Sequence, residues 1–223
     1  MHEVDKNLVS YIEIKIFPLY QRLYAHGLKH IEYVIERSFL IAREYDVNYN
    51  MVYCIACYHD LGLLNVVSDR DSHALESGRI LMQDNYLKSF FTEKQLKIMK
   101  EAVEDHSGSR RIRPRNIYGE IVSDADRDID IETLAKRQLQ TSIKYYKELI
   151  SFEEHFERCY QYILTRTDKK FNLWTENKVL RSQMRKFQEK FIDKEYTRLI
   201  YQKEWDYIER NQLKEKFLNY YAD

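Results

Sequence analysis

The chain contains only five glycines and two prolines among its 223 residues. These two residue types make up about 3% of the sequence, whereas about 12% is usual in globular proteins. Because tight turns between strands require glycine or proline at defined positions, a chain with so few of them cannot form many hairpins. The sequence therefore predicts an all-α fold.

Charge and hydropathy exclude several classes of protein. The 36 Lys and Arg residues balance the 36 Asp and Glu residues, so no global field attracts nucleic acid or an anionic membrane. A hydrophobic fraction of 44% is too high for a disordered chain. No basic segment followed by an apolar run marks the N-terminus, and the longest apolar run, 51–58, is less than half of a membrane span. We therefore expect a cytoplasmic protein, a monomer or a homodimer, with no nucleic-acid or membrane partner.

Apolar residues recur at helical spacing along nearly the whole chain. The third predicted helix is apolar nearly all round and is therefore expected at the centre, with Asn50 as its N-cap and Gly62 as its C-terminal stop. Thr92 and Ser151 each open a capping box. The main predicted helices cover about residues 8–16 (ending before Pro18), 27–45, 50–59, 72–84, 92–106, 131–146 and 151–165. A further helix carries Ile121, Val122 and Ala125, and a packed stripe runs from Glu176 onward. No linker rich in Gly, Ser or Pro interrupts them, so we expect a single helical body over residues 1–223.

Cys54 and Cys57 form a C-x-x-C spacing that occurs in redox pairs and zinc sites. The sequence has no strand–helix–strand context around this pair and no second C-x-x-C. We therefore interpret the two cysteines as small apolar residues on the buried side of a helix.

Histidines are concentrated in the first half of the chain. Five of the seven lie between positions 26 and 106: His26, His30, His59, His73 and His106. Neutral imidazole is the commonest metal ligand, and a mixed imidazole and carboxylate set without thiolate suits iron, manganese, cobalt or nickel as well as zinc. His59 and Asp60 can reach one ion only near a helix end, because adjacent helical residues point about 100° apart. A hydrogen-bonded core pair is the alternative that these residues leave open.

Three ordered motifs carry a resemblance to a known family. They are the stretches 26–31 (HGLKHI), 57–62 (CYHDLG) and 123–127 (SDADR). In their order and helical context they resemble the HD-domain superfamily of metal-dependent phosphohydrolases. The resemblance implies an HD-domain helical bundle over about residues 20–130, with a C-terminal helical extension of about residues 131–223 packed on it. It also implies His30, His59, Asp60 and Asp126 as ligands of one divalent ion, with His30 and not His26 as the first.

His73 and His106 resemble the two extra histidines of binuclear members of this superfamily. Both fall between the His-Asp pair and the final Asp, one at a predicted helix start and one at a helix end. The resemblance then implies that Asp60 bridges two ions. The alternative is that both are ordinary helix-terminal histidines. We expect one or two divalent metal ions as cofactors, with iron or manganese favoured and cobalt, nickel, magnesium or zinc possible.

The segment after His106 is rich in arginine. Arginine forks suit phosphate groups, so this loop is a candidate phosphate clamp, although arginines paired with surface acids are the alternative. Lys29, beside His30, is a weaker candidate. The predicted substrate-binding residues are Lys29, Arg110, Arg111, Arg113 and Arg115.

The function expected from the resemblance is hydrolysis of a phosphate ester of a nucleotide or a similar small phosphorylated metabolite, by a phosphomonoesterase or phosphodiesterase that uses metal-activated water. Asp60, Asp124 and Arg127 are the predicted catalytic residues. Asp124 would orient a ligand or accept a proton, or else serve only as a helix-start acid; Arg127 would pair with Asp124 or reach the substrate. A diiron oxygenase of the same superfamily and a non-catalytic nucleotide-binding regulator are the alternatives.

Overall fold

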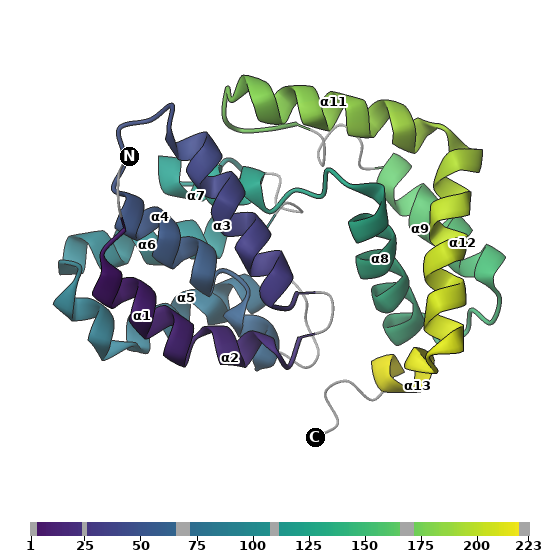
Figure 1. The fold of residues 1–223 in the computed structure, drawn as a ribbon, viewed down its shortest axis with the longest axis horizontal. Coiled ribbons are helices and arrows are strands. Elements are labelled where there is room, and N and C mark those ends of the chain that lie inside the picture. The colour runs from purple at the N-terminus through teal and green to yellow at the C-terminus, as the bar shows by residue number, and fades with distance from the viewer. Residues whose placement is uncertain (1–3, 24–25, 66–71, 108–111, 166–171, 219–223) are drawn as a thin grey trace. The chain divides into compact units, whose positions relative to one another are not determined.

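The computed structural model of the chain is all-α, as the sequence predicts (Figure 1). It describes residues 4–23, 26–65, 72–107, 112–165 and 172–218, and within these ranges every regular element is a helix. None of the helices in these ranges has the length and apolar character needed to cross a bilayer. The chain divides into two compact units: unit 1 contains Met1–Arg127 and Leu173–Asn177, and unit 2 contains Asp128–Asn172 and Lys178–Asp223. That the two behave as a single body stays a prediction.

Unit 1 is built around one buried helix, α4. Its elements are α1 (Lys6–Lys15), α2 (Phe17–Tyr20), α3 (Leu28–Ala42), α4 (Tyr49–Tyr58), the 3₁₀ helix η1 (Leu61–Leu64), α5 (His73–Gln83), the 3₁₀ helix η3 (Asn85–Ser89), α6 (Glu93–Asp105) and α7 (Ile117–Ala125). Helix α4 contacts α1, α3, α5, α6 and α7, and every side chain from Met51 to Tyr58 is buried. A fully buried aliphatic side chain contributes about 1.5–3 kcal/mol, so this apolar run stabilises the whole unit.

The N-terminus of α4 begins two residues earlier than predicted. Asn48, and not Asn50, is the N-cap: its side-chain oxygen accepts hydrogen bonds from the backbone N–H groups of Asn50 at 2.9 Å and Met51 at 3.3 Å. Asn50 instead accepts a hydrogen bond from the backbone N–H of Asp5 at 2.8 Å. Both asparagines are good caps in isolation. The contact with Asp5, the N-cap of α1, engages Asn50 elsewhere.

Three other predicted helix boundaries are confirmed. Helix α1 ends before Pro18, and α2 then starts at Phe17 with Pro18 in its first turn, where a missing N–H costs nothing. Both capping boxes form, with Thr92 and Gln95 at the start of α6 and with Ser151 and Glu154 at the start of α9 (Phe152–Leu164).

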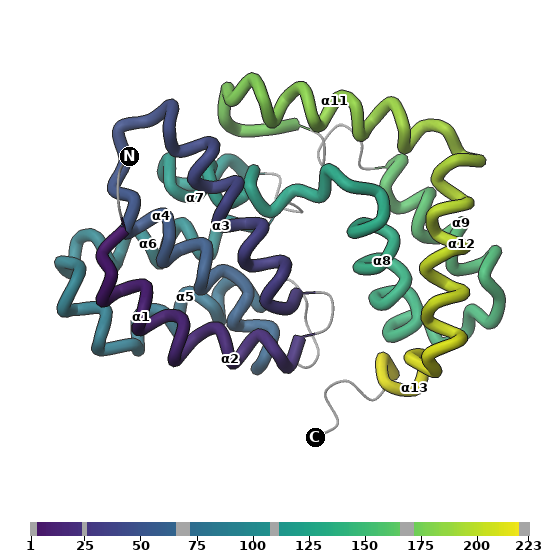
Figure 2. The backbone as a smooth tube through the Cα atoms, viewed as in Figure 1, coloured from purple at the N-terminus to yellow at the C-terminus, as the bar shows by residue number. Residues whose placement is uncertain are grey.

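Unit 2 is a second helical core. It contains α8 (Ile131–Tyr145), α9, α11 (Lys178–Ile192), α12 (Lys194–Arg210) and α13 (Leu213–Leu218). Helix α12 contacts all of the others, and it runs alongside α8 in the tube view (Figure 2). The predicted stripe on α11 is buried at Leu180, Met184, Phe187 and Phe191.

Cys54 and Cys57 lie on the buried helix α4 as free thiols. Burial raises the pKa of both thiols well above the usual value, so both stay protonated. The interpretation of this C-x-x-C pair as packing agrees with its place in the core.

Candidate metal centre

The His59-Asp60 pair lies where α4 ends. His59 is the C-cap of the helix, and its Nδ1 donates to the backbone carbonyl of Ala56 at 2.8 Å. In the neutral ring this tautomer leaves Nε2 unprotonated, the form in which histidine binds metals. Asp60 follows directly and precedes η1. The chain therefore leaves helical geometry at this pair. Adjacent residues within a helix point about 100° apart, so this break allows both side chains to face one point.

Gly62 does not act as the helix stop predicted from the sequence. It lies within η1, and no described glycine has a positive φ. A Cβ atom at Gly62 would instead overlap the backbone carbonyl oxygen of His73 and lie 2.7 Å from the backbone nitrogen of Ser77. The backbone N–H of Gly62 also donates to Ser77 Oγ at 2.8 Å. Glycine is therefore required because η1 packs directly on the first turn of α5.

His73 and His106 occupy the helix ends expected for them. His73 is the first residue of α5, and His106 is the C-cap of α6. The Nδ1 atom of His106 donates to the backbone carbonyl of Val103 at 2.6 Å, so His106 repeats the tautomer of His59. The Nε2 atoms of His73 and His106 lie 3.2 Å apart. The two extra histidines thus meet each other although 33 residues separate them.

Asp60 lies between two pairs of histidines. Its Oδ2 atom is 3.2 Å from His59 Nε2 and 3.4 Å from His30 Nε2. Its Oδ1 atom is 3.5 Å from both His73 Nε2 and His106 Nε2. Each carboxylate oxygen therefore faces its own pair of imidazoles, and the Asp60 side chain is only 2% exposed.

Asp126 completes the first of these two groups. It is the C-cap of α7, and its Oδ1 atom lies 3.2 Å from His30 Nε2 and 3.9 Å from His59 Nε2. His30 and His59 face each other with 3.3 Å between their Nε2 atoms. The structure thus brings together all six residues that the resemblance implies as ligands, from α3, α4, α5, α6 and α7 and the turn after α4.

The spacing of these atoms fits metal ligation. Two ligand atoms about 2.1 Å from one ion, at angles between about 90° and 110°, lie about 3.0–3.4 Å apart. Most distances within each group fall in or near this range. In the neutral form, the rings of His59 and His106 would direct their Nε2 lone pairs at the Asp60 carboxylate, which is an acceptor as well. Positive charge between the rings and the carboxylate is required to make this arrangement favourable. A bound metal ion supplies such charge, and so does a proton on the Nε2 atom of each ring.

Electrostatics keep Asp60 ionised despite its burial. Burial by itself raises the pKa of this carboxyl group, but the neighbouring charges and hydrogen bonds of His59, His26 and His106 outweigh it. The pKa of Asp60 therefore lies well below its usual value.

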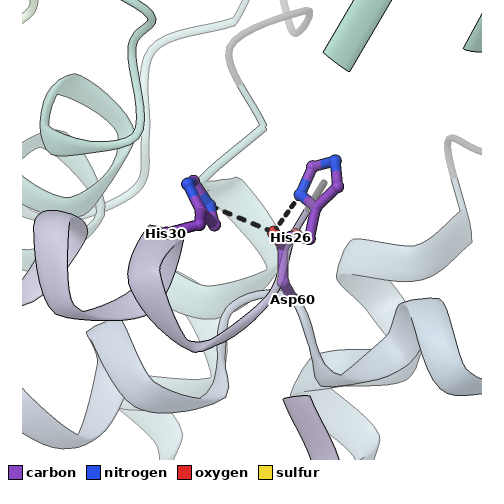
Figure 3. Close-up of side chains that lie close together, drawn as sticks. All are labelled: His26, His30 and Asp60. Carbon is purple, nitrogen blue, oxygen red and sulfur yellow. Dashed lines mark hydrogen bonds and ion pairs between the residues drawn. The ribbon is translucent and has the colours of Figure 1, made fainter. Parts of the chain in front are cut away.

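His26 lies at the same carboxylate, although the sequence excluded it from the ligand set. Figure 3 shows its ring beside Asp60, with Nδ1 2.6 Å from Oδ2. His26, His30 and Asp60 are one of three groups whose ligand atoms lie within 4.8 Å of one another. The sequence signal for this contact was the spacing of four residues between His26 and His30, which allows the two rings to face the same point. His26 lies just before α3, and His30 lies in its first turn.

Arg37 fixes the end of α7 that carries Asp126. This buried arginine lies on α3 and donates from Nη1 to the carbonyl of Arg127 at 2.5 Å and from Nη2 to the carbonyl of Asp124 at 3.4 Å. Carbonyl groups at a helix C-terminus lack partners within the helix, and a cation there also complements the helix dipole. Because His30 is on α3 as well, Arg37 couples the two helices that carry His30 and Asp126.

Asp124 is engaged away from the histidines. One carboxylate oxygen accepts the backbone N–H of Trp174 at 3.0 Å, and the other accepts the backbone N–H and the hydroxyl of Thr175 at 2.7 and 2.8 Å. Burial raises its pKa more than these bonds and the charge of Arg127 lower it. Asp124 lies in the last turn of α7, so the alternative of a helix-start acid is wrong. Its catalytic role, like that of Arg127, stays a prediction.

The predicted phosphate clamp is described only in part. Arg113 Nε pairs with Glu120 at 2.6 Å, and Arg115 pairs through Nε with Asp105 at 2.8 Å and through Nη2 with Glu104 at 2.7 Å. Both arginines thus take the paired arrangement that the sequence left open. Arg110 and Arg111 lie outside the described residues, and Lys29 is exposed at the start of α3.

A helical unit with histidines and carboxylates gathered around one buried aspartate defines a class of all-α metal-binding domains. Residues 27–129 match the family model described as HD domain, and the match spans all six predicted ligands. Residues 27–129 therefore carry an HD domain, which is consistent with the superfamily that the sequence resembles. HD domains are typically metal-dependent phosphohydrolases, so divalent metal binding and hydrolase activity of a general kind follow from the family. No curated protein and no solved structure matches the chain.

Replacing Gly62 by Ala tests the contact between η1 and α5. The added methyl group meets the backbone of His73 and Ser77, so one of the two elements must shift. We expect the free energy of unfolding to fall by about 1–3 kcal/mol, measured by chemical denaturation. The shift also displaces His73, so the variant should bind less metal than the parent chain. An unchanged unfolding midpoint would contradict the close packing of this turn.

Replacing Arg37 by Met tests the coupling of α3 to α7. The variant keeps much of the side-chain volume but leaves the carbonyl groups of Asp124 and Arg127 without the guanidinium donor. We expect a loss of about 2–4 kcal/mol in the free energy of unfolding. Arg43→Met is the matched control, since Arg43 is exposed just beyond α3 and its loss should cost less than about 0.5 kcal/mol. Equal effects of the two substitutions would argue against the coupling.

Proposed function

We propose that this chain is a binuclear phosphohydrolase that cleaves a phosphate ester of a nucleotide or a similar small phosphorylated metabolite. The observation that carries the proposal is the Asp60 carboxylate, whose two oxygens each face a separate pair of histidine Nε2 atoms. A single ion would need only one of the two histidine pairs, His30 with His59 or His73 with His106. Two groups that share one carboxylate are the arrangement that two bridged ions require.

The roles of the individual residues follow from this arrangement. His30, His59 and Asp126 would hold one ion, His73 and His106 would hold the other, and the Asp60 carboxylate would offer one oxygen to each. Divalent ions at such a site lower the pKa of water that they bind and stabilise charge on phosphate oxygens. Iron and manganese are the ions that we favour, because the donor set contains imidazoles and carboxylates and no thiolate.

Phosphate recognition falls to residues at the end of α6 and beyond. Because Arg113 and Arg115 are engaged with Glu120, Glu104 and Asp105, we assign the clamp first to Arg110 and Arg111. Lys29 adds a further positive charge one residue before His30. We also propose a cytoplasmic location, a monomeric or homodimeric state, and a free small molecule as the substrate.

The metal content tests the binuclear proposal directly. The full chain, reconstituted with manganous or ferrous ion and dialysed, should hold close to two ions per chain by elemental analysis. Asp60→Ala should lose both ions, because both groups share this carboxylate. His73→Ala or His106→Ala should lose one and keep the other. Anomalous scattering at the metal edge should show two peaks beside Asp60.

Two other results of these metal measurements would contradict the binuclear proposal. One peak at the group of His30, His59 and Asp126, with His73 and His106 turned away, would reduce the site to a single ion. No bound metal, with histidine protonation alone accounting for the close contacts, would remove the proposed function. Circular dichroism of each variant shows whether a lost ion reflects a lost ligand or a lost fold.

Turnover separates the hydrolase from its alternatives. A set of nucleotides and phosphate esters, each with several divalent ions, should reveal metal-dependent release of phosphate or of a phosphomonoester. Chelation or Asp60→Ala should lower this activity by about 100-fold or more. Oxygen consumption by the ferrous protein, without phosphate release, would favour a diiron oxygenase. Nucleotide retention without turnover would favour a regulator.

A further inference from the structure

His26 lies directly before Gly27, the N-cap of α3, and immediately outside the residues that match the HD domain. Its ring approaches the centre from the side of α3 that also carries His30, and the two rings meet edge to face with 5.3 Å between their centroids. The His26 side chain is 18% exposed, more than any of the six predicted ligands. His26 is therefore at the outer margin of the centre.

The contact of His26 with Asp60 differs in kind from the others. His30, His59, His73 and His106 approach the carboxylate through Nε2, at 3.2–3.5 Å. His26 approaches through Nδ1, and at 2.6 Å its contact is the shortest that the carboxylate makes. A separation of 2.6 Å is that of a short hydrogen bond to a charged acceptor, while the longer separations leave room for an ion.

The direction of this hydrogen bond is fixed by the acceptor. An ionised carboxylate can only accept, so the proton is on His26 Nδ1 and points at Oδ2. Each carboxylate oxygen has two lone-pair directions. The bond from His26 occupies one on Oδ2, which leaves the other directed toward His30 and His59. The bond thus fixes the rotation of the Asp60 carboxylate that divides its two oxygens between the two histidine pairs.

We propose that His26 is a positioning residue that orients Asp60 through its Nδ1–H and is not itself a metal ligand. The inference rests on the proposed function, because it assigns a purpose to the orientation of a bridging carboxylate. Its consequence is that metal affinity depends on a donor at the Nδ1 position and not on the imidazole as a ligand. Hydrogen-bond partners of ligating groups of this kind change metal affinity by about 10- to 100-fold.

Three substitutions of His26 separate these possibilities. The side-chain amide of asparagine can place an N–H near the position of Nδ1, glutamine places its amide nearer to Nε2, and alanine has no donor. Manganous ion is titrated into the metal-free full chain of each variant, and the dissociation constants and the number of sites are measured. We expect affinity about 10-fold weaker or more in His26→Ala and His26→Gln, and within about 3-fold of the parent in His26→Asn.

The readout does not depend on activity. Thermal melting of the metal-free proteins shows whether each variant folds, and spin coupling in the electron paramagnetic resonance spectrum reports whether two manganous ions still share a bridge. A weaker coupling in His26→Ala that His26→Asn restores supports the proposal.

Three results would overturn the inference. His26→Ala with unchanged affinity and coupling would show that Asp60 needs no such donor. His26→Asn as weak as His26→Ala would indicate that the imidazole itself is a ligand. A parent chain that binds no manganous or ferrous ion would remove the proposed function together with this role of His26, whereas the first two results leave the proposed function intact.

Discussion

The centre depends on the burial of one carboxylate, that of Asp60. An ionised carboxylate with a side chain only 2% exposed is costly unless positive charge and hydrogen bonds surround it. Here the neighbouring histidines hold its pKa well below the usual value, although burial acts in the opposite direction. The remaining features of unit 1 can be understood as the means by which four helices bring imidazoles to this one group, while α7 brings the carboxylate of Asp126.

The apolar helix α4 supplies the position of that carboxylate. Because all of its side chains from Met51 to Tyr58 are buried, the residues that follow it begin inside the unit and not at its surface. The chain then turns through η1, where Gly62 allows the backbone to lie against the start of α5. On the other side Arg37 ties α3 to the C-terminus of α7. Two backbone contacts, that of Gly62 with His73 and that of Arg37 with the carbonyl groups of Asp124 and Arg127, thus set where His73 and Asp126 lie.

Unit 1 also includes a short segment from much later in the sequence. Residues 173–177 are held by Asp124 through Trp174 and Thr175, and by a hydrogen bond from the side chain of Asn177 to Glu44 at 2.8 Å. Asp124 therefore has a structural role next to the helix end that carries Asp126. One of the arginines that follow His106 has a similar structural role, since Arg115 stabilises the end of α6 through Glu104 and Asp105. Residues that looked catalytic or substrate-binding in the sequence thus support the positions of their neighbours.

The sequence by itself determined the fold class, most helices and the identity of the HD domain. Scarce glycine and proline, helical periodicity and capping boxes are local properties, and each acts within a few residues of the chain. The order of His30, His59-Asp60 and Asp126 was also readable, because it depends on residue types and their sequence. The place of His73 and His106 at helix ends followed from the same local signals.

Only the tertiary structure decided how these residues meet. The choice of Asn48 over Asn50 as the cap of α4 depends on Asp5, and the role of Gly62 depends on the carbonyl of His73. The engagement of Asp124 depends on residues about 50 positions away, and the contact of His26 with Asp60 joins residues 34 positions apart. Hydrogen bonds and steric contacts act over a few ångströms in space, so no local pattern in the sequence can specify which distant partner a side chain will meet.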